Sequence, residues 1–279
     1  MKNLGYYDGK FDLIENMNVP MTDRAFYFGD GVYEAVFCRN HKIFALDEHI
    51  ERLYRSASLL DIKIPMNKEE MVALLYEMLA KVDGNEHFLY WQVSRGAALR
   101  NHSFGELDGK IAIMIKQMEM PDTYHKVKLI SAEDTRFLHC NIKTLNLIPS
   151  IVAAQKAEAA GATECIFHRG DRVTECSHSN VSILKDGKFI TAPADNLILA
   201  GVARAHLIAA CGALGIPVEE RPYTMDELKA ADEVIVSSTS KLCLAGYELD
   251  GESIGGKAPE LLRSLQDYVV NEYYEKTAL

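Results

Sequence analysis

The chain has 279 residues, of which 48% are hydrophobic and 25% are charged, and its net charge is −10 at pH 7. This composition is typical of a globular protein, and the length suffices for one large domain or two modest ones. The negative charge argues against a general nucleic-acid-binding surface and against attraction to an anionic membrane. Small-molecule chemistry is the function class that these numbers favour.

Targeting and metal-binding signals are missing from the sequence. Residues 1–20 lack the basic start and continuous apolar stretch of a secretory signal, and no window is apolar for long enough to cross a bilayer. The six cysteines are scattered without a Cys-x-x-Cys pair, which favours reduced thiols over zinc ligands or disulfides. We therefore expect a cytoplasmic protein without a metal site.

The first hundred residues alternate strands with two helices. Asp8-Gly9 predicts a hairpin turn, and residues 32–38 and 42–46 read as strands. Apolar residues at helical spacing predict helices over 47–60 and 68–82, the second capped by Asn67 with Glu70. Strands are expected at 87–94 and 110–115.

A break in the pattern at residues 117–122 is the candidate linker between a domain at 1–120 and a larger one at 123–279. Beyond it the sequence predicts a loop that carries Lys143, a hairpin through Asp186-Gly187 and a short helix capped by Thr224 with Glu227. Strands are expected at 127–132, 164–168, 218–221 and 233–237, and helices at 149–160, 202–214 and 259–274. The mixture predicts an α/β (α+β) protein of two domains.

Two segments carry the chemistry. Lys143 lies in Cys-Asn-Ile-Lys-Thr-Leu-Asn at 140–146, and Glu175 lies in Thr-Glu-Cys-Ser-His-Ser-Asn-Val at 174–181. A lysine amine can form a Schiff base with an aldehyde cofactor, and a carboxylate can keep a pyridine nitrogen protonated. By themselves, most lysines are solvated and most glutamates are surface acids.

The whole pattern resembles the class-IV aminotransferases, because six segments occur in that family's order: residues 23–34, 48–53, the Lys143 loop, 174–181, 199–204 and 237–239. The resemblance implies a fold-type IV pyridoxal-phosphate enzyme. It also implies a small N-terminal α/β domain, a larger C-terminal domain built on a mixed sheet or barrel, and a homodimer. Lys143 would then be the catalytic lysine and Glu175 the partner of the pyridine nitrogen.

The resemblance assigns the cofactor phosphate to Arg52 and to a turn before a helix. An arginine fork suits a dianionic phosphate, and backbone N–H groups at a helix N-terminus attract one. Alternatively, Arg52 pairs with Glu48 on an exposed helix face. The remaining cofactor-binding residues implied are Ser179, Leu199, Gly201, Val202, Ala203, Ser238 and Thr239, with Ala203 standing where threonine is common in the family.

Substrate choice depends on Arg100 and His102. They could be solvated loop residues, but in D-amino-acid aminotransferases an Arg-x-His pair, donated across the dimer interface, joins the tyrosine matching Tyr33 to bind the substrate carboxylate. His178 stands where small hydroxyl residues are common, either as a proton carrier or as a hydrogen-bonded bystander.

The expected activity is therefore transamination of D-amino acids, with D-alanine and 2-oxoglutarate as the most typical pair of amino acid and 2-oxo acid. The alternatives are a branched-chain L-amino-acid aminotransferase and an aminodeoxychorismate lyase of the same fold. A binding domain that has lost the cofactor is the remaining reading.

Overall fold

The computed structural model describes residues 1–279, and the chain divides into two compact units. The first unit comprises residues 1–120, 142–146 and 275–279, and the second comprises 121–141 and 147–274. The short segment around Lys143 thus belongs by its contacts to the first unit, although residues of the second flank it in sequence. The domain limits 1–120 and 123–279 stay a prediction.

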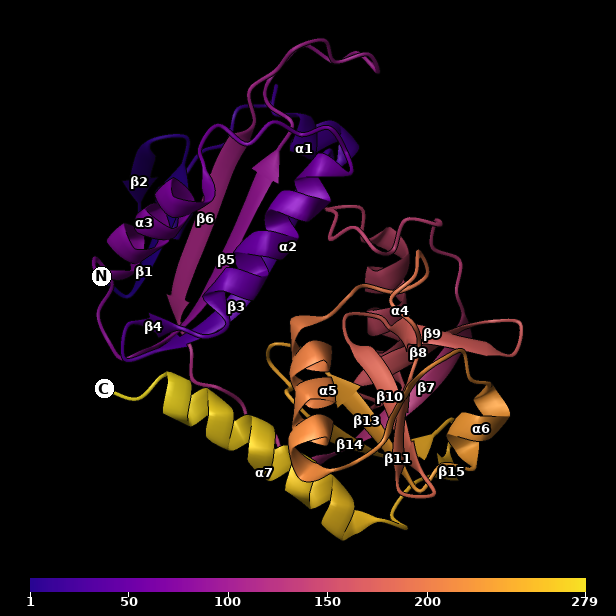
Figure 1. Cartoon of the computed structure of the whole chain (residues 1–279). Helices are drawn as coiled ribbons and strands as arrows, with labels where there is room; N and C mark the ends of the chain where they lie inside the picture. Colours follow the sequence, from indigo (N-terminus) through magenta and orange to yellow (C-terminus); the bar gives the residue numbers. More distant parts are fainter. The chain divides into compact units, whose positions relative to one another are not determined.

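The first unit is an antiparallel sheet covered by two helices (Figure 1). Its strand order is β2-β1-β6-β5-β3-β4, and α2 and α3 lie over one face. The elements are β1 (Asn3–Tyr7), β2 (Lys10–Asp12), a 3-10 turn (Ile14–Asn16), α1 (Arg24–Phe28), β3 (Gly31–Arg39), β4 (Lys42–Ile43), α2 (Leu46–Ser58), α3 (Lys68–Leu79), β5 (Glu86–Ser94) and β6 (Lys110–Gln117).

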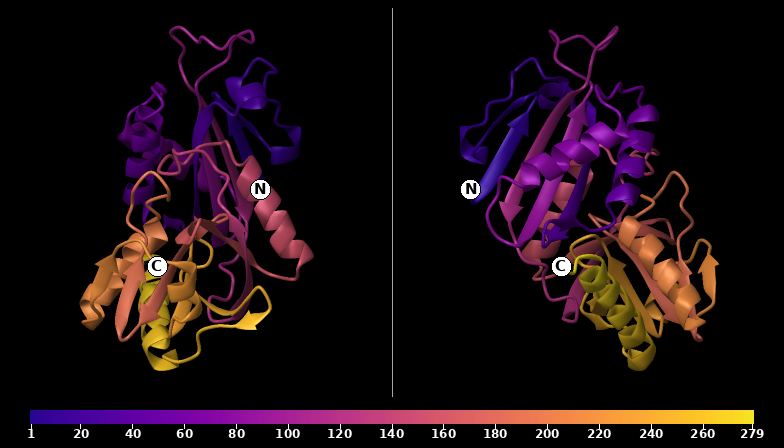
Figure 2. Two further views of the ribbon diagram at one scale, coloured as in Figure 1. Left: turned by 90° about the vertical axis from the view of Figure 1, so that its right-hand side faces the viewer. Right: turned by 60° about the vertical axis from the view of Figure 1, so that its left-hand side comes forward.

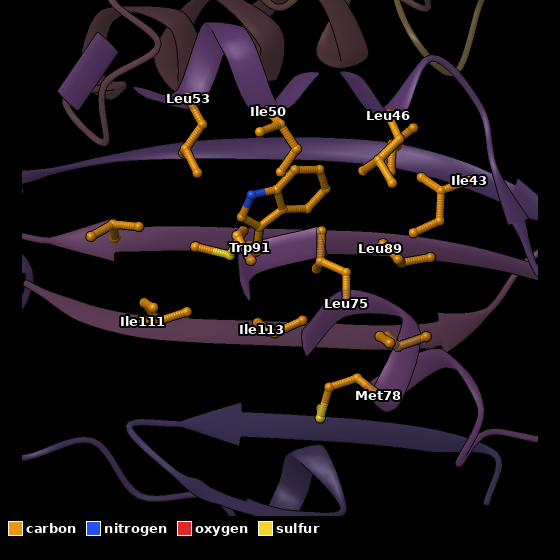
Figure 3. Close-up of a cluster of buried hydrophobic side chains, with 14 of the residues drawn as sticks. Ile43, Leu46, Ile50, Leu53, Leu75, Met78, Leu89, Trp91, Ile111 and Ile113 are labelled. Carbon is orange, nitrogen blue, oxygen red and sulfur yellow. The ribbon is translucent and has the colours of Figure 1, made fainter. Parts of the chain in front are cut away.

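The core of the first unit forms where the apolar stripes of these helices meet the sheet. Figure 3 shows Leu46, Ile50 and Leu53 pointing from α2 toward Trp91 of β5, which is fully buried. Alternation along β5 places Leu89 and Trp91 on the same face, as a period of two requires. Burying such side chains stabilises the fold by about 1.5–3 kcal/mol each.

Local signals set the limits of several elements. The expected capping boxes are confirmed at Asn67 with Glu70 and at Thr224 with Glu227. The Asp8-Gly9 turn is confirmed, with φ of 47° and 90°. The strand predicted at 42–46 is wrong beyond Ile43, because Ala45 adopts a left-handed conformation (φ 50°) and helix α2 begins at the next residue.

The second unit is built on a mixed nine-stranded sheet with the order β12-β11-β10-β13-β14-β7-β8-β9, and β15 pairs with β14. Its elements are β7 (Lys126–Glu133), α4 (Ile148–Ala159), β8 (Glu164–Arg169), β9 (Arg172–Cys176), β10 (Asn180–Lys185), β11 (Lys188–Thr191), α5 (Val202–Leu214), β12 (Val218–Glu220), α6 (Met225–Lys229), β13 (Glu233–Ser237), β14 (Leu244–Leu249), β15 (Glu252–Ser253) and α7 (Pro259–Lys276).

This sheet has to curl. Strand β9 ends the path, five strand spacings away from β10, yet only residues 177–179 connect the two strands. A flat sheet would separate them by about 24 Å, whereas so short a connection spans about 14 Å. The N–H of Cys176 donates to the Ser179 carbonyl (2.7 Å), which closes the turn. The curl brings β9 back beside β10.

Helices α5 and α7 run side by side in the second unit (Figures 1 and 2), and His206 of α5 lies 2.7 Å from Glu272 of α7. The predicted limits of α5 are confirmed. Strand β14 was not predicted from the sequence, although it is a central strand between β13 and β7. No helix is both long and apolar enough to cross a membrane.

Candidate active site

Lys143 is carried by a short extended segment that pairs with the start of β3. The Tyr33 N–H donates to the Lys143 carbonyl (3.0 Å), and the Leu145 N–H donates to the Gly31 carbonyl (3.0 Å). The Lys143 N–H donates to the hydroxyl of Ser56 on α2 (3.3 Å). A side chain at Gly31 would collide with Leu145 at 2.7 Å, so glycine permits this close pairing. The lysine backbone is thereby fixed at both faces.

The Lys143 amine lies over an aromatic ring. Its Nζ is 4.3 Å from the ring centroid of Tyr33, which in turn stacks on Tyr90 at 5.5 Å. The ring attracts an ammonium group through its quadrupole. Lys143 and Tyr33, both predicted site residues, are therefore neighbours, and both are partly buried.

Arg52 belongs to a buried ion cluster beside this segment. Its Nε and Nη2 donate to the two oxygens of Glu34 (2.7 and 2.8 Å), and His49 Nδ1 lies 2.7 Å from the same carboxylate. Arg52 is 5% exposed and Glu34 fully buried. Arg52 is therefore not the exposed helix residue that the alternative reading assumed, since its guanidinium lies inside the unit.

Burial and charge compete in this cluster. Burial alone would raise the pKa of the Glu34 carboxyl, but the charge and hydrogen bonds of Arg52, with help from His49, lower that pKa to about 2. Burial lowers the pKa of His49 in spite of its carboxylate neighbour. Glu34 thus stays ionised and fixes the orientation of the Arg52 fork.

The loop with Arg100 and His102 is anchored on Phe28 at the end of α1. The Arg100 guanidinium lies 4.9 Å from the Phe28 centroid, and the His102 ring lies 5.3 Å from it. Arg24 fixes the loop between them, because its Nη1 donates to the Asn101 carbonyl (2.7 Å). Arg100 and His102 are exposed in the single chain, yet they share one aromatic support.

Glu175 is buried in the second unit, so the reading of it as a surface acid is wrong. One of its oxygens accepts from Arg136, and the other accepts from the Asn180 amide (3.1 Å) and the Leu199 N–H (3.0 Å). Arg136 is itself held by Asp134 through two nitrogens at 3.0 Å. With three hydrogen bonds accepted, the carboxylate has one lone pair left that can accept a further hydrogen bond.

Burial dominates the electrostatics of Glu175. It raises the pKa of that carboxyl above its usual range, although Arg136 and the Leu199 N–H act in the opposite sense. A carboxylate that burial disfavours gains from another positive partner, such as a protonated pyridine nitrogen.

The phosphate-binding turn predicted at 199–204 is the start of α5. Gly201 is the N-cap, and no side chain caps the helix there. A Cβ on Gly201 would lie 2.0 Å from Asn180 Oδ1, so only glycine fits beside that amide. The backbone N–H groups of Val202 and Ala203 lie in the first turn of the helix, where anions bind.

Two hydroxyls at the end of β13, which pairs with β10, lack hydrogen-bond partners. Ser237 faces Asn180 in the strand register, and the buried Oγ atoms of Ser237 and Ser238 have no hydrogen-bond partner. Buried polar atoms without partners are uncommon, and hydroxyls of this kind are free to donate to a bound anion. Together with the uncapped helix and the Glu175 carboxylate, these hydroxyls fit the phosphate and pyridine ends of pyridoxal phosphate. Ser237 was not predicted from the sequence.

Ser179 directs its hydroxyl hydrogen elsewhere. It donates to Glu164 (2.7 Å) and accepts from Lys241 (3.1 Å). Contact between Ser179 and a cofactor stays a prediction, as do the roles of Thr239 and of the other site residues.

The comparisons with known proteins agree with this geometry. The family model for amino-transferase class IV matches residues 31–246. A protein named D-alanine aminotransferase from Listeria monocytogenes serotype 4b (strain F2365) is 41% identical over 265 residues, which cover 92% of this chain and 92% of that protein. The chain belongs to the class-IV aminotransferases.

Solved structures of this family have the same fold. A branched-chain aminotransferase from Thermoproteus uzoniensis, determined with norvaline, matches with a TM-score of 0.87 at 25% identity and covers 98% of this chain and 96% of that one. The fold IV-transaminase CpuTA1 from Curtobacterium pusillum matches with a TM-score of 0.82 at 24% identity, over 94% of this chain and 93% of that one. The expected fold-type IV architecture is confirmed.

Membership in the family also confirms the expected reaction class and cofactor. This class-IV aminotransferase is a transaminase that uses pyridoxal phosphate. Sequence reasoning missed Arg136, Glu34 and Lys241, because nothing in their local sequence indicates the carboxylates or cations that they meet across the fold. Asn180 stood in the quoted Ser-Asn-Val motif, and its amide could have been assigned to Glu175 from that signal.

Proposed function

We propose that this class-IV aminotransferase transfers the amino group of D-amino acids, typically D-alanine, to 2-oxoglutarate. The observation that carries the proposal is that the Phe28 ring contacts both the Arg100 guanidinium (4.9 Å) and the His102 ring (5.3 Å), so one aromatic side chain supports an arginine and a histidine. Such a pair suits a substrate carboxylate. The name of the Listeria relative supports the same substrate class.

Different residues of the chain bind the cofactor and transfer the proton. Bound pyridoxal phosphate supplies an aldehyde that exchanges amines and a ring that accepts electrons from the substrate Cα. Lys143 provides the amine for covalent attachment and, once released, takes the Cα proton. In the second unit the start of α5, Ser237, Ser238 and Thr239 bind the phosphate, and Leu199 and Ser179 contact the cofactor. In the first unit Arg52 is the guanidinium that we assign to a phosphate.

Glu175 holds positive charge at the pyridine nitrogen. Its carboxylate is positioned by Arg136 and Asn180, and burial makes it a poor anion unless a cation faces it. Tyr33 supports the Lys143 amine and borders the substrate. The second half-reaction, from the 2-oxo acid, uses the same proton transfers in reverse.

We further propose that the enzyme acts as a homodimer in the cytoplasm. Met21 (76% exposed), Phe26 (69%) and Leu99 (84%) present apolar surface on the loops and helix near Arg100. Exposed apolar clusters mark protein contacts, and a second copy would bury this one. In that assembly Arg100 and His102 serve the neighbouring subunit's substrate.

The decisive experiment is an assay of keto-acid formation from a panel of D- and L-amino acids. We expect D-alanine and related D-amino acids to react fastest. Faster turnover of L-leucine or L-isoleucine than of every D-amino acid would assign the protein to the branched-chain enzymes instead. Release of pyruvate from aminodeoxychorismate would favour the lyase.

Arg100→Ala tests the carboxylate assignment. We expect kcat/KM for D-alanine to fall by roughly 2 to 4 kcal/mol of transition-state binding, because a charge-assisted pair is lost, while the visible spectrum of the bound cofactor stays unchanged. Amines without a carboxylate should lose little. In a mixed dimer with Lys143→Ala chains, one site should be doubly damaged and the other intact, whereas two half-damaged sites would contradict donation across the interface.

A further inference from the structure

The turn between β9 and β10 links the residues that hold the pyridine end of the site. Glu175 lies one residue before the end of β9, and Asn180 begins β10. Residues 177–179 join them, so the conformation of this turn sets how the Glu175 carboxylate lies relative to the Asn180 amide that donates to it. Contacts that order the turn therefore add to those of Arg136 and Leu199 in positioning Glu175.

A single buried carboxylate collects the polar side chains of this turn. Glu164 of β8 is fully buried; its Oε2 accepts from the Ser177 hydroxyl (2.5 Å) and its Oε1 from the Ser179 hydroxyl (2.7 Å). His178 Nδ1 lies 3.0 Å from the same Oε1. All three side chains of the turn thus meet Glu164.

Lys241 supplies the opposite charge. Only 9% exposed, it donates to Glu164 Oε1 and to the Ser179 hydroxyl (3.1 Å). Lys241 lies four residues after β13, and Glu164 opens β8, so the pair joins distant parts of the curled sheet to the turn. Lys241 keeps the pKa of the Glu164 carboxyl below its usual range, against the effect of burial.

The contacts of His178 define its proton. Lys241 Nζ lies 3.0 Å from His178 Nε2, and an ammonium group can only donate, so Nε2 has to accept. The proton of the neutral ring is then on Nδ1, which lies 3.0 Å from Glu164 Oε1 and 3.1 Å from the Ser177 hydroxyl oxygen. A proton on Nε2 would face the ammonium group directly.

We propose that Glu164 and Lys241 are positioning residues of the transaminase, which hold the 177–179 turn and through it the Glu175 carboxylate, with His178 as the neutral Nδ1–H link between them. Both side chains act through the turn that they contact. The inference rests on the proposed function only in that Glu175 has to serve the cofactor.

Positioning predicts a specific kinetic pattern. Lys241→Met in the holoenzyme should lower kcat about 10- to 100-fold, since small displacements of a reacting group have effects of this size. KM should change less than about twofold, because Arg100 and His102 lie elsewhere. Every variant is assayed with saturating pyridoxal phosphate, because the Lys241 N–H donates to the carbonyl of Ser238, a proposed phosphate residue (3.1 Å). Lys241→Arg should restore most of kcat. The matched control is Lys188→Met, whose amine pairs with Glu219 at the surface and is 48% exposed.

The dependence on Glu175 separates positioning from a general loss of stability. In a Glu175→Gln background, Lys241→Met should lower kcat less than about threefold, because the group it positions has already been lost. An equal factor in both backgrounds would overturn the proposal. All rates are measured with whichever amino acid the wild-type enzyme uses best, so failure of the D-amino-acid assignment leaves this test intact.

A second readout needs no turnover. Nitrogen-15 NMR of labelled histidine in the wild-type holoenzyme should give a neutral His178 protonated on Nδ1, and Lys241→Met should shift that proton toward Nε2; a wild-type proton on Nε2 refutes the link. If Lys241→Met does not fold, Glu164→Gln/Lys241→Met removes both buried charges. This double variant should fold and should have a reduced kcat. If its kcat equals that of the wild type, the positioning role is refuted.

Discussion

Two buried glutamates, each paired with an arginine, behave in opposite ways in the two units. Glu34 meets Arg52 through two hydrogen bonds and His49 through a third, and its pKa falls to about 2. Glu175 meets Arg136 through one oxygen, and its pKa is raised by burial. Arg136 divides its nitrogens between Glu175 and Asp134.

The difference shows that burial with an arginine does not by itself define a carboxylate's role. Glu34 is fully compensated, so its charge stabilises the fold and orients Arg52. Glu175 is undercompensated, so its charge is costly until another cation arrives. The first arrangement suits a structural clamp and the second suits a cofactor partner. Four substitutions test this contrast.

The largest effect is expected from Lys143→Ala, which leaves both carboxylate clusters intact. Turnover should fall to less than about a thousandth, because covalent attachment and proton transfer are lost together. Cofactor can still be retained through its phosphate contacts. Steady-state assays check this, with exposed Lys156→Ala on α4 as the control. Activity above that level would mean that another lysine is catalytic.

Glu34→Gln should act on stability. Removing one partner of a buried ion pair should lower the free energy of unfolding by about 3 to 5 kcal/mol at pH 7. Because the folded pKa lies below the usual 4.5, this stabilisation is present above about pH 4.5 and disappears as the pH falls toward 2. Urea unfolding across this pH range measures whether the free energies of unfolding of the wild type and Glu34→Gln converge at low pH. The exposed Glu77→Gln is the control. A pH-independent difference would contradict the clamp.

Glu175→Gln should act on chemistry instead. Loss of the charge opposite the pyridine nitrogen should reduce kcat about a hundredfold, the scale for removing one preorganised electrostatic contact. The cofactor-free protein should be no less stable at neutral pH, because a raised folded pKa means that the ionised carboxyl opposes folding as the pH rises. Kinetics and thermal unfolding together check both parts. Marked destabilisation with normal kcat would reverse the roles of the two glutamates.

The smallest effect is expected from Ser238→Ala. Its hydroxyl has no partner within the chain, so the stability of the cofactor-free protein should not change by more than about 0.5 kcal/mol. Affinity for pyridoxal phosphate should fall about tenfold, the value of a hydrogen bond to a charged group. Cofactor titration measures this, with Ser253→Ala on exposed β15 as the control. Unchanged affinity would remove Ser238 from the phosphate site.

The sequence by itself determined the local elements and the chemical repertoire. Helix α3 and helix α6 begin at capping boxes whose partners are three residues apart, and the Asp8-Gly9 turn needs only its own two residues. Lys143 and Glu175 were recognisable because an amine and a carboxylate in those motifs match the needs of the cofactor. Such signals act over a few residues and survive without knowledge of the fold.

Only the tertiary structure decided the partners. Arg52 meets Glu34, 18 residues away in sequence, Arg136 meets Glu175, 39 residues away, and Lys241 reaches Glu164 across 77. The first pairing depends on how α2 packs on β3, and the other two depend on the strand order of the second sheet; neither has a local pattern. Each of the two buried glutamates accepts three hydrogen bonds, so the charges that the fold brings to them separate the clamp from the cofactor partner: Nε and Nη2 of Arg52 both face Glu34, whereas Glu175 shares Arg136 with Asp134.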